Sequence, residues 1–117
     1  MPKYLYLLYA DESKMPSPDS PQMAQQEAAF GRYYEELSGR GMFKAGDPVQ
    51  PSKTATTVRV RNGSTKTASG PATTGNEQII GFYVVEAKNQ DEAIAYAAKV
   101  PSAAVGSIEV RPIIGSS

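Results

Sequence analysis

Two segments of the chain are apolar at nearly every position and are too short to be buried helices. They are residues 3–9 (KYLYLLY) and residues 78–87 (QIIGFYVVEA). Short runs that are apolar on both faces are typical of strands buried inside a sheet. Gly81, within the second run, indicates a bulge or the close approach of another backbone. We therefore expect two well-buried strands, the first of them near the centre of the sheet.

Helical spacing of apolar residues follows a typical start signal at Ser20-Pro21. Serine is a favoured N-cap, and proline is favoured at the first helical position. The pattern predicts a helix over residues 20–38, ended by Gly39 and Gly41. Its apolar face is expected to contain Met23, Phe30, Tyr34 and Leu37.

A second, shorter helix is predicted to begin at Asn89. Glu92 follows three residues later, as in a capping box, and Pro101 stops the helix. Adjacent acids at Asp91 and Glu92 suit the first turn of a helix. The predicted apolar stripe is narrow and consists of Ala93, Ile94, Ala97 and Ala98.

The middle of the chain predicts a β-hairpin. Residues 54–61 and 64–69 are rich in β-branched side chains and are joined by Asn62-Gly63, the strongest short-range hairpin signal. Val58 and Val60 share one face, and the arginines between and after them share the other. Residues 42–45 are read as a short strand, 46–51 as a rigid turn, 70–77 as a loop and 107–113 as a last strand.

The order of these elements is β-α-β, hairpin, β-α-β. It predicts an α+β fold of the ferredoxin-like split βαβ type with an inserted hairpin, in one domain over residues 1–117. Such a fold has an antiparallel sheet with both helices on one face. Because the chain is too short for a third layer, we expect the other face to pack on a second copy in a homodimer.

The composition of the chain limits which partners, catalytic schemes and metal sites are expected. Twelve basic residues balance twelve acidic ones, so a nucleic acid or an anionic membrane is not expected as a partner. The chain contains neither cysteine nor histidine, so Ser-His-Asp and Cys-His nucleophilic schemes are impossible within it. We expect no metal and no cofactor. The N-terminal apolar run is too short for a membrane span and lacks a cleavage site, so we expect a soluble, cytoplasmic protein.

Several short motifs recur in a fixed order between Tyr4 and Ile113. They are YADE at residues 9–12, ATTVR at 55–59, GFYVV at 81–85, DEA at 91–93 with Ala97, Ala98 and Pro101, and IEVRP at 108–112. On these landmarks the sequence resembles the YCII-related proteins, and within them the bacterial subgroup named for its DGPF motif. The resemblance implies a dimeric α/β barrel, and for some relatives a link to extracytoplasmic-function sigma factors.

The departure from that family falls on the signature itself. Asp-Gly-Pro-Phe becomes Ser-Gly-Pro-Ala at residues 69–72, and the acidic stretch that follows becomes TTGNE at residues 73–77. The glycine, the proline and the final acid, Glu77, are retained. The acid/base histidine suspected in related YCII proteins has no counterpart in this chain.

The candidate ligand-binding residues are Arg59, Ser69, Thr74 and Glu77, with Glu77 and Asp11 as weak catalytic candidates. A carboxylate beside hydroxyls acts as a general base once it is desolvated, and arginine holds anions through bidentate contacts. The competing interpretations are a solvated loop for Glu77, Ser69 and Thr74, and for Arg59 an exposed strand face that discourages edge pairing. Three strand tyrosines, Tyr4, Tyr6 and Tyr9, are read as sheet core or interface rather than as a stacking pocket.

These observations predict a dimeric module that binds a small polar or anionic ligand, or a protein, without strong catalytic machinery. The alternative is an enzyme acting on a small molecule, with Glu77 or Asp11 as its base in a cleft beside the signature loop. A second alternative, an accessory regulator linked to a sigma factor, is implied by the family resemblance alone.

Overall fold

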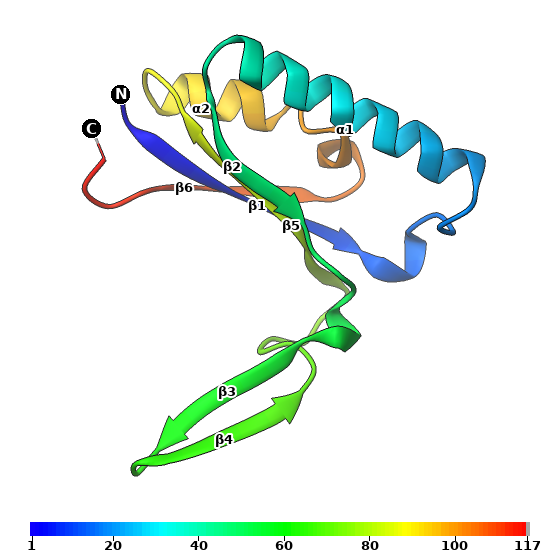
Figure 1. Cartoon of the computed structure of the whole chain (residues 1–117), viewed down its shortest axis with the longest axis vertical. Coiled ribbons are helices and arrows are strands. Elements are labelled where there is room, and N and C mark those ends of the chain that lie inside the picture. The colour runs from blue at the N-terminus through cyan, green and yellow to red at the C-terminus, as the bar shows by residue number, and fades with distance from the viewer. Residues whose placement is uncertain (117) are drawn as a thin grey trace.

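The computed structural model describes residues 1–116 and shows a four-stranded sheet, two helices and a separate hairpin (Figure 1). The sheet strands pair in the order β2-β5-β1-β6, and every pairing is antiparallel. The sheet contains β1 (Lys3–Asp11), β2 (Phe43–Pro48), β5 (Glu77–Glu86) and β6 (Ser107–Pro112). The other elements are α1 (Pro21–Gly39), α2 (Gln90–Ala97), β3 (Thr56–Arg61) and β4 (Ser64–Ser69).

The predicted fold class is confirmed. With the hairpin set aside, the chain runs β1-α1-β2-β5-α2-β6, which is the ferredoxin-like order. Both helices lie on the same side of the sheet in Figure 1, and β1 lies at its centre, paired to β5 and to β6. No helix in residues 1–116 has the length and apolar character needed to cross a membrane.

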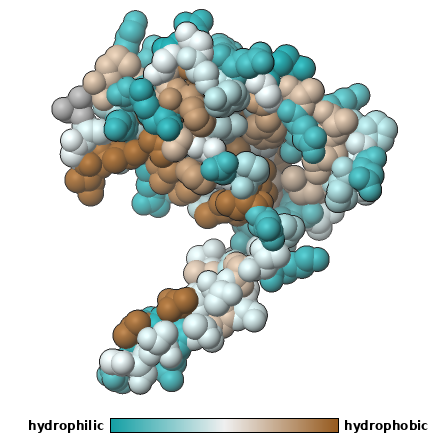
Figure 2. Space-filling model, viewed as in Figure 1, coloured by the Kyte–Doolittle hydropathy of each residue, from teal (hydrophilic) through white to brown (hydrophobic). Residues whose placement is uncertain are grey.

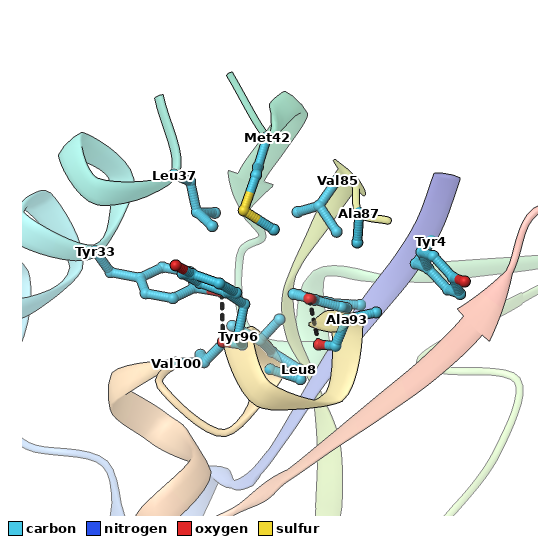
Figure 3. Close-up of a cluster of buried hydrophobic side chains, with 12 residues drawn as sticks. Tyr4, Leu8, Tyr33, Leu37, Met42, Val85, Ala87, Ala93, Tyr96 and Val100 are labelled. Carbon is cyan, nitrogen blue, oxygen red and sulfur yellow. Dashed lines mark hydrogen bonds between the residues drawn. The ribbon is translucent and has the colours of Figure 1, made fainter. Parts of the chain in front are cut away.

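The core lies between the sheet and the two helices and is tied together by tyrosine hydroxyls (Figure 3). The Tyr6 hydroxyl on β1 donates a hydrogen bond to the Ala93 carbonyl at 2.5 Å, and the Tyr33 hydroxyl on α1 donates to the Tyr96 carbonyl at 2.9 Å. Each bond joins two different elements. Buried tyrosines therefore contribute both apolar area and fixed connections.

The apolar faces of the helices differ from the sequence prediction at several positions. Tyr34 is 47% exposed and its neighbour Tyr33 is buried with Leu37, so the face of α1 is rotated toward Tyr33. In α2 the buried residues are Ala93, Tyr96 and Ala97, whereas Ile94 is 49% exposed. The predicted stripe included Ile94 and left out Tyr96. The Tyr96 ring packs inward, and its backbone carbonyl accepts a hydrogen bond from the Tyr33 hydroxyl.

Gly81 performs both roles that the sequence predicted for it. The pairing of β1 with β5 shifts register beside Gly81, as at a β-bulge. A side-chain carbon at this glycine would also lie 3.1 Å from the Asp47 carbonyl oxygen, so the edge strand approaches it closely. That strand, β2, continues to Pro48, and the rigid turn predicted over residues 46–51 is therefore shorter than expected.

The inserted hairpin projects away from the sheet and helices (Figure 1). Asn62 and Gly63 have φ of 52° and 77°, the left-handed values that a type I′ turn requires, so the predicted hairpin is confirmed. Within residues 1–116 its strands pair only with each other. A hydrogen bond of 2.8 Å from the Gly70 amide to the Ala55 carbonyl closes its base.

The side of the sheet that faces away from the helices, here called the open face, is apolar at its centre. Tyr4, Tyr6 and Leu8 point into the core, so the alternate residues of β1 point to the open face. Their register partners on β5 share that face. The apolar stripe of the open face consists of Leu5, Leu7, Tyr9, Ile79, Phe82 and Val84.

Candidate functional site

A groove of about 690 Å³ lies between α1 and the β2–β5 side of the sheet, and is here called the α1 groove. Helix α1 forms one wall, and the end of β2 with the middle of β5 forms the other. The segment after β1 closes one end through Met15, Pro16 and Pro18. The volume is typical of small-molecule sites, which are concave and mostly apolar.

Aromatic side chains form much of the groove wall. The Tyr34 and Phe43 rings meet edge to face with centroids 4.8 Å apart, and Phe43 lies 6.3 Å from Tyr83. Tyr34, which is exposed with respect to the core, therefore belongs to this wall. Gly46 makes the wall possible, because a side-chain carbon there would lie 2.6 Å from the Tyr83 ring.

One carboxylate of the groove is held in place by the turn that precedes the hairpin. Glu12 accepts hydrogen bonds from the Ser52 amide at 2.7 Å and from the Ser52 hydroxyl at 2.5 Å. These bonds lower the pKa of Glu12 below its ordinary value because they stabilise the ionised form. The groove therefore has a fixed, negatively charged group at its edge.

The charged residues that line the groove are all acidic: Glu12, Glu27 and Asp47. Polar groups that suit hydrogen bonding are the amide of Gln26 and the hydroxyls of Tyr34 and Tyr83. Burial raises the pKa of Tyr83, so its hydroxyl stays protonated and able to donate. An apolar, aromatic cavity with acidic edges suits an apolar molecule that carries a donor or a cationic group.

The two catalytic candidates from the sequence lie outside this groove, at one end of the sheet. Asp11 and Glu77 are register partners on β1 and β5. The Ser107 hydroxyl donates to Glu77 at 3.1 Å, and Ser13 donates to Asp11 from its amide at 3.0 Å and its hydroxyl at 2.6 Å. The Ser13 bonds lower the pKa of Asp11, which weakens it as a proton acceptor near neutral pH.

The remaining sequence candidates are exposed and distributed over the hairpin and the signature loop. Arg59 lies within β3, Ser69 ends β4, and Thr74 lies in the loop before β5. Among the five candidates, Asp11 lines a second cavity, of about 740 Å³, that also includes Lys14 and Ser102. Their assignment as a ligand site stays a prediction.

Sequence reasoning missed the residues that form the α1 groove. Glu12 entered the sequence analysis only as the last residue of the YADE landmark, and Tyr83 as one residue of a buried strand. Neither has a local signal, because the groove is formed by segments far apart in sequence. Within residues 1–116 no cluster of three or more aspartates or glutamates is arranged as metal ligands.

Known proteins similar to this chain include one relative by sequence and one solved structure. An uncharacterized protein from Rhizobium meliloti (strain 1021) is 30% identical over 115 residues, covering 94% of this chain and 90% of that protein. A solved structure of 5-chloro-2-hydroxyhydroquinone dehydrochlorinase from Burkholderia phenoliruptrix AC1100 is similar with 20% identity and a TM-score of 0.47, covering 95% of this chain and 91% of that one. The YCII-related domain matches residues 2–116, so the chain belongs to the YCII-related family.

Proposed function

We propose that this protein binds a small molecule in the α1 groove and acts as a homodimer. The observation that carries the binding proposal is the groove itself: about 690 Å³, walled by aromatic residues and lined by acidic but not basic side chains among the described residues. Cavities of this size with a few polar groups are the usual place for a small ligand.

The charges of the groove select the kind of ligand. A carboxylate or phosphate would meet Glu12 and Glu27 with no arginine or lysine among the described lining residues to balance them. An amine gains both from those carboxylates and from aromatic faces, which attract cations. The proposed ligand is therefore an aromatic or other apolar molecule with an amine group, rather than the anionic ligand expected from Arg59.

Binding is favoured over acid–base catalysis by the state of the carboxylates. A general base works best when its pKa lies near the working pH. Hydrogen bonds from Ser13 and Ser52 move the pKa of Asp11 and Glu12 in the opposite direction, below their ordinary values. The proposal therefore assigns Glu12 to holding the ligand and gives it no proton-transfer step.

The homodimer is supported by the open face. Ile79 on this face is 39% exposed, and the stripe around it is only partly buried within one copy. Contiguous apolar surface on a soluble protein marks an interaction site. We propose a second copy of the chain as the partner, because other copies are present wherever the protein is made.

The binding proposal is tested with two probes of nearly equal shape and opposite charge, phenethylamine and hydrocinnamate. Amide chemical shifts are followed by NMR during titration. We expect phenethylamine to bind more tightly, with shifts confined to α1, β2 and the middle of β5. Equal affinity for both probes would contradict the ligand class, and shifts centred on residues 69–77 would move the site to the signature loop.

Gly31 offers a matched pair of variants for the same titration. It lines the groove, and a side-chain carbon there meets no atom within 4 Å. Gly31→Leu is expected to fill the groove and weaken phenethylamine binding by about tenfold or more, whereas Gly31→Ala leaves room for the probe. Glu77→Gln, outside the groove, should bind as the wild type does. Unchanged binding by Gly31→Leu would rule out the groove.

A further inference from the structure

The hairpin formed by β3 and β4, here called the arm (residues 56–69), is too exposed to be explained by the fold of one copy. Every arm residue except Thr57 is exposed, including Val58 at 59% and Val60 at 58%. Figure 2 shows hydrophobic spots on the otherwise neutral or hydrophilic arm. An isolated two-stranded hairpin is marginally stable in water, so an arm of this kind normally packs on something.

The arm also makes the molecule unusually extended. The radius of gyration is 16.0 Å, whereas a compact domain of this length is expected to have about 13 Å. In the body of the molecule, the apolar stripe of the open face is left partly exposed. The chain therefore carries two unpartnered apolar surfaces within residues 1–116, one on the arm and one on the sheet.

The two faces of the arm differ in charge. Val58 and Val60 lie opposite Thr67 and Thr65, so this face is uncharged. The other face carries Arg59, opposite Lys66, and Arg61. The uncharged face can lie on an apolar surface without burying a charge, which is the costly event in forming an interface.

Charge also favours the approach of an arm to the body of another copy. The arm contains three basic and no acidic residues, so the rest of the chain retains nine basic and twelve acidic residues. At the end of the sheet where the arm begins, the carboxylates Asp11 and Glu77 lie opposite each other. Like charges in register are unfavourable. Lys14 lies 4.0 Å from Asp11 within the same copy, and cations of a second copy would add to this attraction.

We infer that the arm is an intermolecular element: the Val58 and Val60 face of one copy lies on the open face of a second copy, against the stripe that includes Leu5, Leu7 and Phe82. The basic face of the arm stays toward solvent. This inference rests on the homodimer proposed above and specifies which element makes the contact. Sheet-on-sheet packing without the arm is the competing arrangement.

The absence of native cysteine allows a direct cross-linking test. Thr65→Cys labels the uncharged face of the arm, and Ala45→Cys labels the open face beside Val84. The two single-cysteine proteins are mixed, allowed to exchange subunits and treated with a short bismaleimide. We expect cross-linked pairs that contain one copy of each variant, identified by mass spectrometry.

A control variant, Ser38→Cys, places the thiol on an exposed position of α1 on the other side of the molecule. Cross-linking of Thr65→Cys to Ala45→Cys that does not exceed cross-linking to Ser38→Cys would overturn the inference. Cross-linking of Ala45→Cys only to itself would also overturn it and would favour sheet-on-sheet packing, with the dimer itself retained.

A second measurement does not depend on cysteine geometry. Val58→Ser with Val60→Ser is expected to raise the dimer dissociation constant by about tenfold or more, since each buried valine contributes to association. The matched control, Arg59→Ser with Arg61→Ser, changes the opposite face and should have a smaller effect. Melting curves show whether each variant stays folded. An unchanged dissociation constant for the valine variant would overturn the inference, and a wild-type chain that is only monomeric would overturn the dimer as well.

Discussion

Tyr33 and Tyr34 are adjacent and chemically identical, yet the fold uses them for different purposes. Tyr33 is 4% exposed and joins α1 to α2, whereas Tyr34 is 47% exposed and forms the wall of the α1 groove. Burial, followed by nearby tyrosines and Glu36, raises the pKa of Tyr33, and burial, followed by Glu92, raises that of Tyr6. The folded state therefore holds both side chains in their neutral form.

This difference predicts how stability changes in alkaline solution. A pKa raised by folding contributes stability that is complete below the ordinary tyrosine pKa of 10.0 and is lost as pH rises above it. Tyr33→Phe is expected to cost about 0.5–1.5 kcal/mol at neutral pH through the lost hydrogen bond. It should also make the loss of stability above pH 10 shallower. Urea unfolding followed by circular dichroism between neutral pH and about pH 11 measures both effects.

Tyr34→Phe is the matched control for this experiment, because it removes the same hydroxyl from the exposed neighbour. Its unfolding free energy and its pH profile should stay close to those of the wild type. Equal effects of the two substitutions would show that the Tyr33 bond to the Tyr96 carbonyl is not what ties the helices together.

Among the elements, α2 is the one most dependent on its ends. It has only eight residues, so few internal hydrogen bonds support it. Asn89 accepts a hydrogen bond from the Glu92 amide at 2.9 Å, and the Glu92 carboxylate accepts one from the Lys88 amide at 2.9 Å. This reciprocal pair differs slightly from the standard capping box, since the second donor lies one residue before the cap.

Asn89→Ala is expected to lower the free energy of unfolding by about 1 kcal/mol, because the first turn of α2 loses its cap. Asn89→Asp retains an acceptor and suits the positive end of the helix, so its unfolding free energy should stay close to that of the wild type. Urea denaturation compares the three proteins. If Asn89→Ala proved as stable as Asn89→Asp, the packing of Ala93, Tyr96 and Ala97 alone would be holding the helix.

At the scale of the whole molecule, the two faces of the sheet differ: the helices cover one face, and the open face is left uncovered within one copy. The helix side has Tyr6, Leu37 and Val85 fully buried. On the other side, residues 1–116 of one copy supply no layer above the apolar stripe. For the proposed dimer, an apolar sheet face of this kind favours association more than the net charge does, since the net charge of the chain is zero.

The dimer proposal predicts a single species of twice the chain mass in sedimentation at micromolar concentration. Ile79→Gln should weaken association by about tenfold, because it replaces an apolar side chain of the open face by a polar one. Ile94→Gln is the matched control: it removes an isoleucine of similar exposure from α2, at 49% against 39%. Wild-type protein that sediments only as a monomer, or equal effects of the two substitutions, would contradict the proposal.

The local parts of this fold were largely predictable from the sequence. Ser20, Asn89 and Asn62-Gly63 act through neighbouring backbone groups, so their effect is visible within a few residues. The buried strands and the order of elements followed from apolar runs, and these together defined the ferredoxin-like plan. Gly81 was correctly assigned because a glycine inside an apolar strand usually marks a bulge or a closely approaching backbone.

Tertiary structure alone decided which side chains meet. The choice of Tyr33 over Tyr34, and of Tyr96 over Ile94, depends on a rotation of each helix against the sheet that apolar spacing does not specify closely. The α1 groove combines Glu12, fixed by Ser52 forty residues away, with aromatic residues of α1, β2 and β5. The sequence by itself determined the elements and their order, because those depend on local backbone preferences and burial. Only the folded chain decided the site, because its residues come together through contacts between distant segments.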